Sequence, residues 1–403
     1  QGAKIGADLD ASGSTFEGTF EGRNLSVRTN LFLSDTKLGE VNLDTAEIGA
    51  DLDARGSTFE ETFEAVNASV QGNLFLSEKA TFKTVDLNAA EIGADLNASG
   101  STFEETFKAV DASVQGNLFL SNKATFKTVG LIGAKIGGDL FANGSIFEGT
   151  FTAPDISVQG SLLLRDSATF KEVDLSGAKI GQNLDMHGST FSGKINLASA
   201  EVGDVFVLSE ANDVPSWTDD SRLVLRNLSV SALQDHEDAW KGLERRLDLI
   251  GFVYQRIGGA DVEADQEMAD LEADRETASP VRSQEIASRS TDWLAAWLNK
   301  QENSESVHFP QPYQQLADTL RAQGFSDKAD AIMIAANDHR YSLPTIDMGT
   351  KALLWIEWAT IGYGYERFPL PCLAGCVCPP WNDRRQFRQR RLGAFCAFTT
   401  ILV

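Results

Sequence analysis

The stretch "AEIGADLDARGSTFEETFEAVNASVQGNLFLSEKATFKTVDLNA" at positions 46–89 decides the fold, because an almost identical copy follows it at 90–133. The two segments are identical at 36 of 44 positions. The repeat can be followed from the first residues to about Ser209, and one isoleucine marks each unit: Ile5, Ile48, Ile92, Ile136 and Ile180. A fixed period of this length predicts a solenoid, in which each unit buries its apolar side chains only by stacking on its neighbours.

Each 44-residue unit divides into two related halves of 22 residues, since 48–52 (IGADL) corresponds to 70–74 (VQGNL) and 57–59 (STF) to 80–82 (ATF). Short stretches such as 73–76 alternate polar and apolar residues, which is the period of a β-strand. We therefore expect a mainly β protein, a parallel β-helix with about 22 residues per coil. The close alternative is a four-sided coil of the pentapeptide type, whose five-residue period this sequence does not keep.

Phenylalanine recurs at the same corner of successive coils, and these side chains are expected to form a ladder that points into the rod. The ladder consists of Phe16, Phe59, Phe82, Phe103, Phe126, Phe147, Phe170 and Phe191. The next residue alternates between glutamate and lysine, as in Glu60, Lys83, Glu104 and Lys127. Opposite charges on stacked coils attract weakly, whereas a slip by one coil would place like charges together, so this alternation is predicted to fix the register.

The second half of the chain predicts a C-terminal α-helical module. We divide the sequence into regular β-helix repeats at 1–209, an irregular terminal coil that caps the rod at 210–260, an acidic linker or helix at 261–281, a helical hairpin module at 282–344, and an apolar helix with a Cys- and Arg-rich tail at 345–403. Pro310 is expected to open the first helix of the hairpin, Gly324 to end it, and Ser326 to cap the second.

The composition narrows the classes of partner. The net charge of −23 predicts a surface that repels nucleic acid. All four cysteines lie within 372–396, without a neighbouring histidine or a paired C-x2-C motif, so a metal site there is not predicted. No run of 18 apolar residues is present, and the start at Gln1 within a repeat is interpreted as that of a fragment.

The sequence predicts surfaces rather than a reaction site. A possible binding surface consists of Phe32, Phe75 and Phe119, and a possible membrane interface of Trp355, Trp358, Tyr363 and Tyr365. No catalytic, cofactor-binding or metal-binding motif is recognised, and no cofactor is expected. Acids that recur at one position of the coil, such as Asp51 and Asp95, are interpreted as a solvated face, His187 as a lone surface histidine, and His236 as part of a charged loop.

The repeats, together with "PQPYQQLADTLRAQGFSDKADAI" at 310–332 and "GYGYERF" at 362–368, resemble bacterial membrane-associated β-helix repeat proteins, mostly uncharacterised and sometimes labelled membrane-associated oxidoreductases. The resemblance covers about residues 1–367 and supplies no catalytic residues. Because the repeat presents a regular surface without a recognisable reaction site, the sequence predicts a non-enzymatic scaffold or binding protein with a protein or envelope partner. The resemblance, Trp355 with Trp358, and the arginine cluster before Leu392 indicate the cytoplasmic face of the bacterial inner membrane, with residues 346–363 on the membrane surface. The alternatives are an envelope polysaccharide-binding or polysaccharide-active protein and a membrane-associated oxidoreductase.

Overall fold

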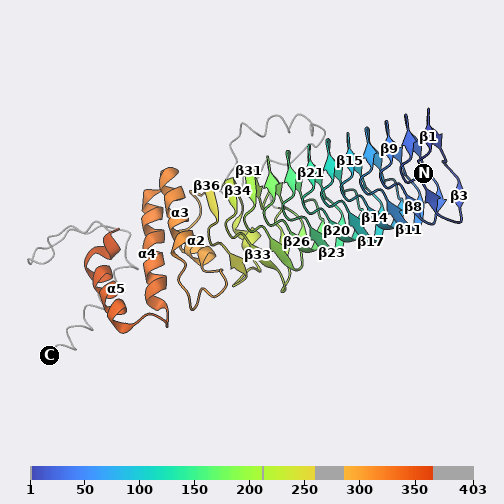
Figure 1. The fold of residues 1–403 in the computed structure, drawn as a ribbon. Coiled ribbons are helices and arrows are strands. Elements are labelled where there is room, and N and C mark those ends of the chain that lie inside the picture. The colour runs from blue at the N-terminus through green and yellow to red at the C-terminus, as the bar shows by residue number, and fades with distance from the viewer. Residues whose placement is uncertain (1, 211–212, 259–285, 366–403) are drawn as a thin grey trace, which may run out of the picture.

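The computed structural model describes residues 2–210, 213–258 and 286–365. They form a parallel β-solenoid of about 11 coils of roughly 22 residues, followed by four α-helices at one end (Figure 1). The predicted mainly β fold with a C-terminal helical part is therefore confirmed. At about 4.8 Å per coil the rod is roughly 50 Å long.

The strands pair in parallel with the strand one coil before and one coil after, and the terminal strands have one such neighbour. The first sheet contains β1 (Lys4–Ile5), β2 (Leu9–Asp10), β5 (Ser26–Val27), β6 (Leu31–Phe32), β9 (Glu47–Ile48), β10 (Leu52–Asp53), β12 (Ser69–Val70), β13 (Leu74–Phe75), β15 (Glu91–Ile92), β16 (Leu96–Asn97), β18 (Ser113–Val114), β19 (Leu118–Phe119), β21 (Lys135–Ile136), β22 (Leu140–Phe141), β24 (Ser157–Val158), β25 (Leu162–Leu163), β27 (Lys179–Ile180), β28 (Leu184–Asp185), β31 (Glu201–Val207), β34 (Ser229–Gln234) and β36 (Val253–Ile257).

The second sheet closes the other side of each coil. It contains β3 (Thr15–Phe16), β4 (Phe20–Glu21), β7 (Lys37–Leu38), β8 (Val41–Asn42), β11 (Thr58–Glu64), β14 (Thr81–Asp86), β17 (Thr102–Lys108), β20 (Thr125–Gly130), β23 (Ile146–Thr152), β26 (Thr169–Asp174), β29 (Thr190–Phe191), β30 (Lys194–Asn196), β32 (Ser216–Trp217), β33 (Arg222–Val224) and β35 (Leu247–Asp248). Pairing thus continues past Ser209, where the sequence repeat fades, to Ile257.

The predicted phenylalanine ladder forms the core of the second sheet. From Phe59 to Phe191 its rings are buried and stack with centroid distances of 4.6–5.4 Å. Trp217 extends the stack at 5.2 Å from Phe191. Phe16 holds the same register position as the ladder, through Leu38, but it is 37% exposed because its coil has a neighbour on only one side.

A second inward ladder, not recognised in the sequence, alternates phenylalanine with valine. Its buried members are Phe63, Val85, Phe107, Val129, Phe151 and Val173. Each phenylalanine of this ladder meets the first ladder edge to face, as Phe107 does with Phe103 at 5.2 Å. Alternating large and small side chains fill the interior evenly, so this ladder repeats only every second coil.

The backbone supplies a second reason for the double-coil period. Three residues separate Phe59 from Phe63, whereas two separate Phe82 from Val85, and the strand register shifts at this point in every pair. The corner before this strand offsets the difference in length. It contains one residue with a left-handed backbone conformation in the first coil, Gly56, and two consecutive ones in the next coil, Glu78 and Lys79. One residue therefore moves between strand and corner from coil to coil, and both coils keep the same perimeter.

The alternating charges beside the first ladder form ion pairs in part. Lys37 pairs with Glu60 at 2.8 Å and Lys83 with Glu61 at 2.6 Å. Lys83 was expected to face Glu60, but the extra residue of β11 places Glu61 nearest. These exposed pairs each contribute little, about 0–1 kcal/mol.

The recurring acids belong to an Asp/Asn ladder on the corners of the first sheet. Each side-chain oxygen accepts a hydrogen bond of 2.7–3.4 Å from the backbone N–H one coil further along: Asp8, Asn30, Asp51, Asn73, Asp95, Asn117, Asp139, Ser161 and Asn183. Carboxylates occupy alternate rungs and are therefore separated by an intervening amide or hydroxyl. The acids have a structural role, and their repeat matches the double-coil period.

We expect Gly116→Ala to lower the free energy of unfolding by about 1–3 kcal/mol, because a Cβ at this corner would lie 2.3 Å from Asp95 Oδ1 and 3.0 Å from the Ala94 backbone. Gly130→Ala is the matched control, since the nearest atom to its new Cβ would be 3.9 Å away. Urea unfolding followed by circular dichroism compares the two. Equal effects would show that the close approach does not limit the Asp/Asn ladder.

The helical module closes the open end of both sheets. It contains α2 (Thr291–Leu298), α3 (Pro310–Ala322), α4 (Ser326–Ser342) and α5 (Met348–Ile361), and α3 packs on β36 while α3 and α4 form the predicted hairpin (Figure 1). Ser326 is the first helical residue rather than the cap expected from the sequence.

The cap consists of side chains on one face of α3. Gln311 accepts from Gly251 N at 2.8 Å, Gln315 and Thr319 donate to Tyr254 O, and Gln323, just beyond the helix, donates to Ile257 O. The second sheet is closed by residues 300–302, whose backbone pairs with Leu247. Residues 222–257 form the last coils as expected, but their own edge needs this cap because an edge strand leaves backbone groups unpaired.

A buried ion pair fixes the module to the rod. Arg289, just before α2, donates to both carboxylate oxygens and to the backbone carbonyl of Asp235, which follows β34. Neither side chain is exposed. Trp240 Nε1 donates to the same carboxylate at 2.6 Å, and its ring meets that of Trp297 at 5.2 Å. Lys328 of α4 donates to three carbonyls of the turn that carries Arg289.

Candidate functional site

An outward-facing column of the first sheet contains the predicted binding surface. Strand register orders it as Asp10, Phe32, Asp53, Phe75, Asn97, Phe119, Phe141, Leu163, Asp185 and Val207. Phe32, Phe75 and Phe119 are each half-buried. Polar residues separate the three along the column, so the structure does not bring them into one patch.

The continuous apolar part of this column, here called the apolar stripe, consists of Phe119, Phe141 and Leu163 on three consecutive coils. Phe141 was not among the predicted surface residues, although it lies one 22-residue coil beyond Phe119. The two rings stack at 4.9 Å with an interplanar angle of 5°. Stacking along the rod covers the ring faces and leaves the edges outward. Because a sugar packs on a ring face, this geometry favours contact with apolar protein side chains over polysaccharide.

Phe75 of the predicted surface is covered on one side by an arginine. The Arg55 guanidinium lies over the Phe75 ring at 5.1 Å and covers one of its faces.

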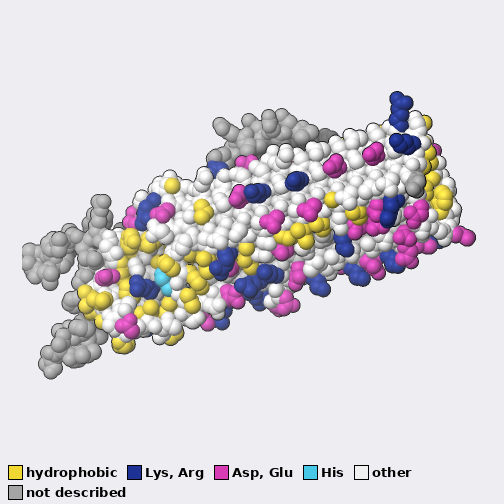
Figure 2. All heavy atoms as spheres, in the orientation of Figure 1, with side chains coloured by type: hydrophobic (Ala, Val, Ile, Leu, Met, Phe, Trp, Pro, Cys, Tyr) yellow, Lys and Arg dark blue, Asp and Glu magenta, His cyan; other side chains and the backbone are white. Residues whose placement is uncertain are grey.

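Figure 2 shows hydrophobic side chains in a line along the rod and gathered at the helical end, with acidic side chains dense around the N-terminal coils.

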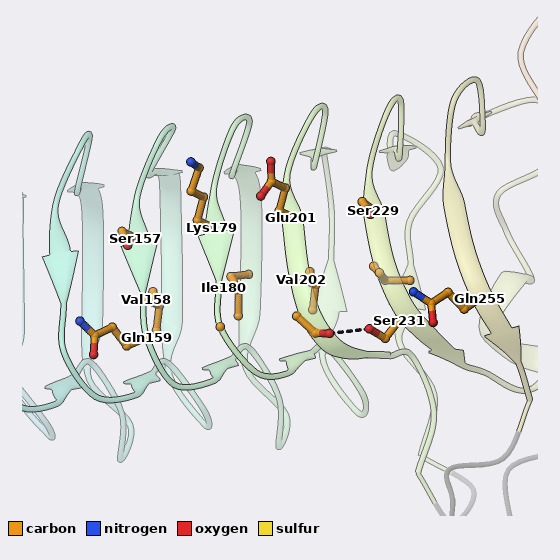
Figure 3. A pocket seen from close by; sticks show the side chains of 13 residues that line it. Ser157, Val158, Gln159, Lys179, Ile180, Glu201, Val202, Ser229, Ser231 and Gln255 are labelled. Atoms are coloured by element: carbon orange, nitrogen blue, oxygen red, sulfur yellow. Dashed lines mark hydrogen bonds between the residues drawn. The ribbon is translucent and has the colours of Figure 1, made fainter.

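A shallow groove of about 690 Å³ crosses the outer face of the first sheet near the helical end. Its polar lining comes from separate coils: Ser157, Gln159, Lys179, Glu201, Ser229, Ser231 and Gln255 (Figure 3). The Ser231 hydroxyl donates to Gly203 O at 2.5 Å. Since Ser157, Lys179 and Glu201 follow one another in a single column, the groove continues the regular surface and brings no nucleophile and base together.

His187 departs from the rest of the rod, and the interpretation as a lone surface residue is wrong. It is 6% exposed at a corner after β28, and Nδ1 lies 2.7 Å from Asp185 Oδ1 and 3.5 Å from Glu210 Oε2. Burial acts to lower the pKa of His187, but the hydrogen bond and charge of Asp185 and the charge of Glu210 outweigh it and raise the pKa. Arg165 contacts the other Asp185 oxygen at 3.3 Å.

The remaining histidines of the described chain have local structural partners. His236 caps the short 3₁₀-helix η1 (Glu237–Trp240), with Asp238 N donating to its Nδ1 at 3.1 Å. His308 Nδ1 lies 3.3 Å from His339 Nδ1, and His339 Nε2 contacts Ser304 O. Burial, followed by the charges of His339 and Arg340, lowers the pKa of His308 to about 4.

Helix α5 carries Trp355 and Trp358 of the predicted membrane interface, Tyr363 and Tyr365 follow the helix, and the exposed apolar residues of α5 are different ones. Trp355, Trp358, Tyr363 and Tyr365 are each partly buried. Tyr363 donates to Asp338 of α4 at 3.2 Å, which turns it toward the hairpin. Met348, Leu353 and Ile356 are instead 81%, 63% and 50% exposed. Aromatic residues suggested the interface in the sequence, whereas packing on α4 exposes the aliphatic face.

The chain is thus a helix-capped parallel β-solenoid. No known family model, curated protein or solved structure matches it. Among the described residues, no helix combines the length and the apolar character needed to cross a membrane. The Cys- and Arg-rich tail lies outside the described residues.

Proposed function

We propose that this protein is a non-enzymatic scaffold that attaches to a membrane surface through α5 and extends its rod to a protein partner. The observation that supports membrane attachment is the exposed aliphatic face of α5, which lies at the end of the molecule farthest from the N-terminal coils (Figure 1). An apolar helix face at the protein surface is typical of interfacial attachment. The sequence beyond it, 366–403, contains six arginines against Glu366 and Asp383, which suits an anionic surface.

The rod supports the scaffold part of the proposal. Its acids serve the Asp/Asn ladder, its charges alternate, and its groove repeats a regular column of side chains. The apolar stripe offers two ring edges and a leucine side chain on three consecutive coils, which suits a flat protein contact. These features favour a scaffold over the two alternatives, a polysaccharide-binding or polysaccharide-active protein and an oxidoreductase, because no feature of the described residues specifically supports either of them.

Sedimentation with lipid vesicles tests the attachment. We expect the full chain to sediment with phosphatidylcholine vesicles containing phosphatidylglycerol, and Leu353→Glu with Ile356→Glu to stay in the supernatant, because charge on the exposed aliphatic face of α5 opposes its insertion. Ser113→Glu with Ser157→Glu adds the same charge to the rod and is expected to bind as the wild type does. Failure of the wild type to sediment, or equal binding by the α5 variant, would contradict attachment through α5.

A further inference from the structure

Three potential metal ligands converge at the corner that follows β28. One ligand atom from each of Asp185, His187 and Glu210 lies within 4.8 Å of the other two. Within residues 2–210, 213–258 and 286–365, no other group of three histidine, cysteine or acidic side chains meets this condition. The cluster is therefore specific to one corner, in a chain with 58 acidic residues.

The distances suit a small divalent cation. His187 Nδ1 lies 2.7 Å from Asp185 Oδ1 and 3.5 Å from Glu210 Oε2. Ligands at about 2.0–2.1 Å from a tetrahedral Zn²⁺ lie roughly 3.3 Å from one another. The spacing from the imidazole to Glu210 is close to this value, and the spacing to Asp185 has to lengthen by about 0.6 Å for the two groups to share one ion.

The surroundings hold two of the ligands in place. Asp185 and His187 are 5% and 6% exposed, and the Asp185 carboxylate also accepts from His187 N at 3.2 Å. Arg165 contacts the second oxygen of Asp185 at 3.3 Å and leaves Oδ1 directed at the imidazole. Such outer contacts orient metal-binding carboxylates. Glu210 is exposed and can adjust to an incoming ion.

A sister corner elsewhere in the rod holds a cation at the corresponding place. Three double coils earlier, Asp53, Arg55 and Glu78 occupy the positions of Asp185, His187 and Glu210. There the Arg55 guanidinium joins both carboxylates, at 2.6 Å to Asp53 and 3.1 Å to Glu78. The space between the two acids is thus one that the fold fills with positive charge. Imidazole is shorter than the arginine side chain and offers a lone pair in place of fixed charge.

We propose that Asp185, His187 and Glu210 bind a divalent transition-metal ion of the Zn²⁺ class. Imidazole and carboxylate are ligands that this class accepts. The ion joins successive coils at the corner, as Arg55 does in the sister corner, and its fourth position faces solvent. This site is independent of the scaffold function and of α5.

Zinc titration calorimetry on the full chain tests the site, with the four cysteines first alkylated so that they do not bind zinc. Wild type is expected to bind one equivalent more than His187→Arg, which reproduces the sister corner and keeps the coil intact. Glu210→Gln is expected to weaken that equivalent by about tenfold or more. Cobalt in place of zinc is expected to give a visible absorption band in the wild type that His187→Arg lacks.

Equal zinc stoichiometry and affinity in wild type and His187→Arg would overturn the proposal. That result would mean that the imidazole serves only as a hydrogen-bonded bridge between the two carboxylates. Zinc-dependent thermal stability provides the second measurement, since an ion bound only by the folded state raises the melting temperature. A rise of equal size in both proteins would likewise contradict the site.

Discussion

Phe126→Ala is expected to lower the free energy of unfolding by about 3–5 kcal/mol. The ring is fully buried and stacks on Phe103 at 4.6 Å and on Phe147 at 5.2 Å, while Phe107 contacts it in a T-shaped arrangement at 5.8 Å. Alanine removes these contacts and leaves a cavity that adjacent coils cannot close, because their backbones are hydrogen-bonded on both sides. Urea unfolding followed by far-ultraviolet circular dichroism measures the change.

Phe119→Ala is the matched control, since it removes the same side chain from the same coil. Phe119 is half-buried on the outer face, and its main aromatic contact is Phe141. We expect a loss of about 1 kcal/mol. Similar losses for the two variants would mean that the inner ladder does not carry the stability of the rod.

Arg289→Ala is expected to destabilise the helical module by about 3–5 kcal/mol, because it leaves the Asp235 carboxylate buried without its cation. The carboxylate would keep its bond from Trp240 but lose two hydrogen bonds from the guanidinium, and the Asp235 backbone carbonyl would lose a third. Hydrogen exchange at the amides of α2, α3 and α4 is expected to accelerate most, since these helices are joined to the rod through this contact.

Arg245→Ala provides the comparison for that variant. Arg245 forms an exposed ion pair with Glu305 between the rod and the module, and its loss is expected to cost about 1 kcal/mol or less. If Arg289→Ala left exchange in the module at the level of Arg245→Ala, the buried pair would not be the main attachment. Asp235→Ala combined with Arg289→Ala is expected to cost less than the sum of the single changes.

The repeat predicted the coil, the parallel pairing and the first ladder, because identical residues at a fixed period must occupy equivalent positions. It did not reveal the second ladder, because Phe63 and Val85 differ in type and are displaced by one residue where the strand register shifts. The Asp/Asn ladder was interpreted as a solvated face for a related reason. Hydrogen bonds between side chain and backbone leave no hydrophobic pattern.

The contacts that join the two parts of the chain were also beyond sequence reasoning. Asp235 and Arg289 are 54 residues apart, and no periodicity relates a solenoid corner to a helical module. The glutamines of α3 resemble a solvated helix face unless an edge strand is known to lie beneath them. For His187 a signal was available, because it occupies the position of Arg55 three double coils later and keeps both flanking acids.

The cap on β36 also determines how the rod behaves toward other copies of itself. An uncovered β edge is a template on which another chain can add strands and grow into a fibre. Gln311, Gln315, Thr319 and Gln323 occupy the acceptor and donor groups that such growth would use. Polymerisation from this end is therefore blocked by four polar side chains, and detaching α3 would convert a rod of fixed length into a seed for aggregation.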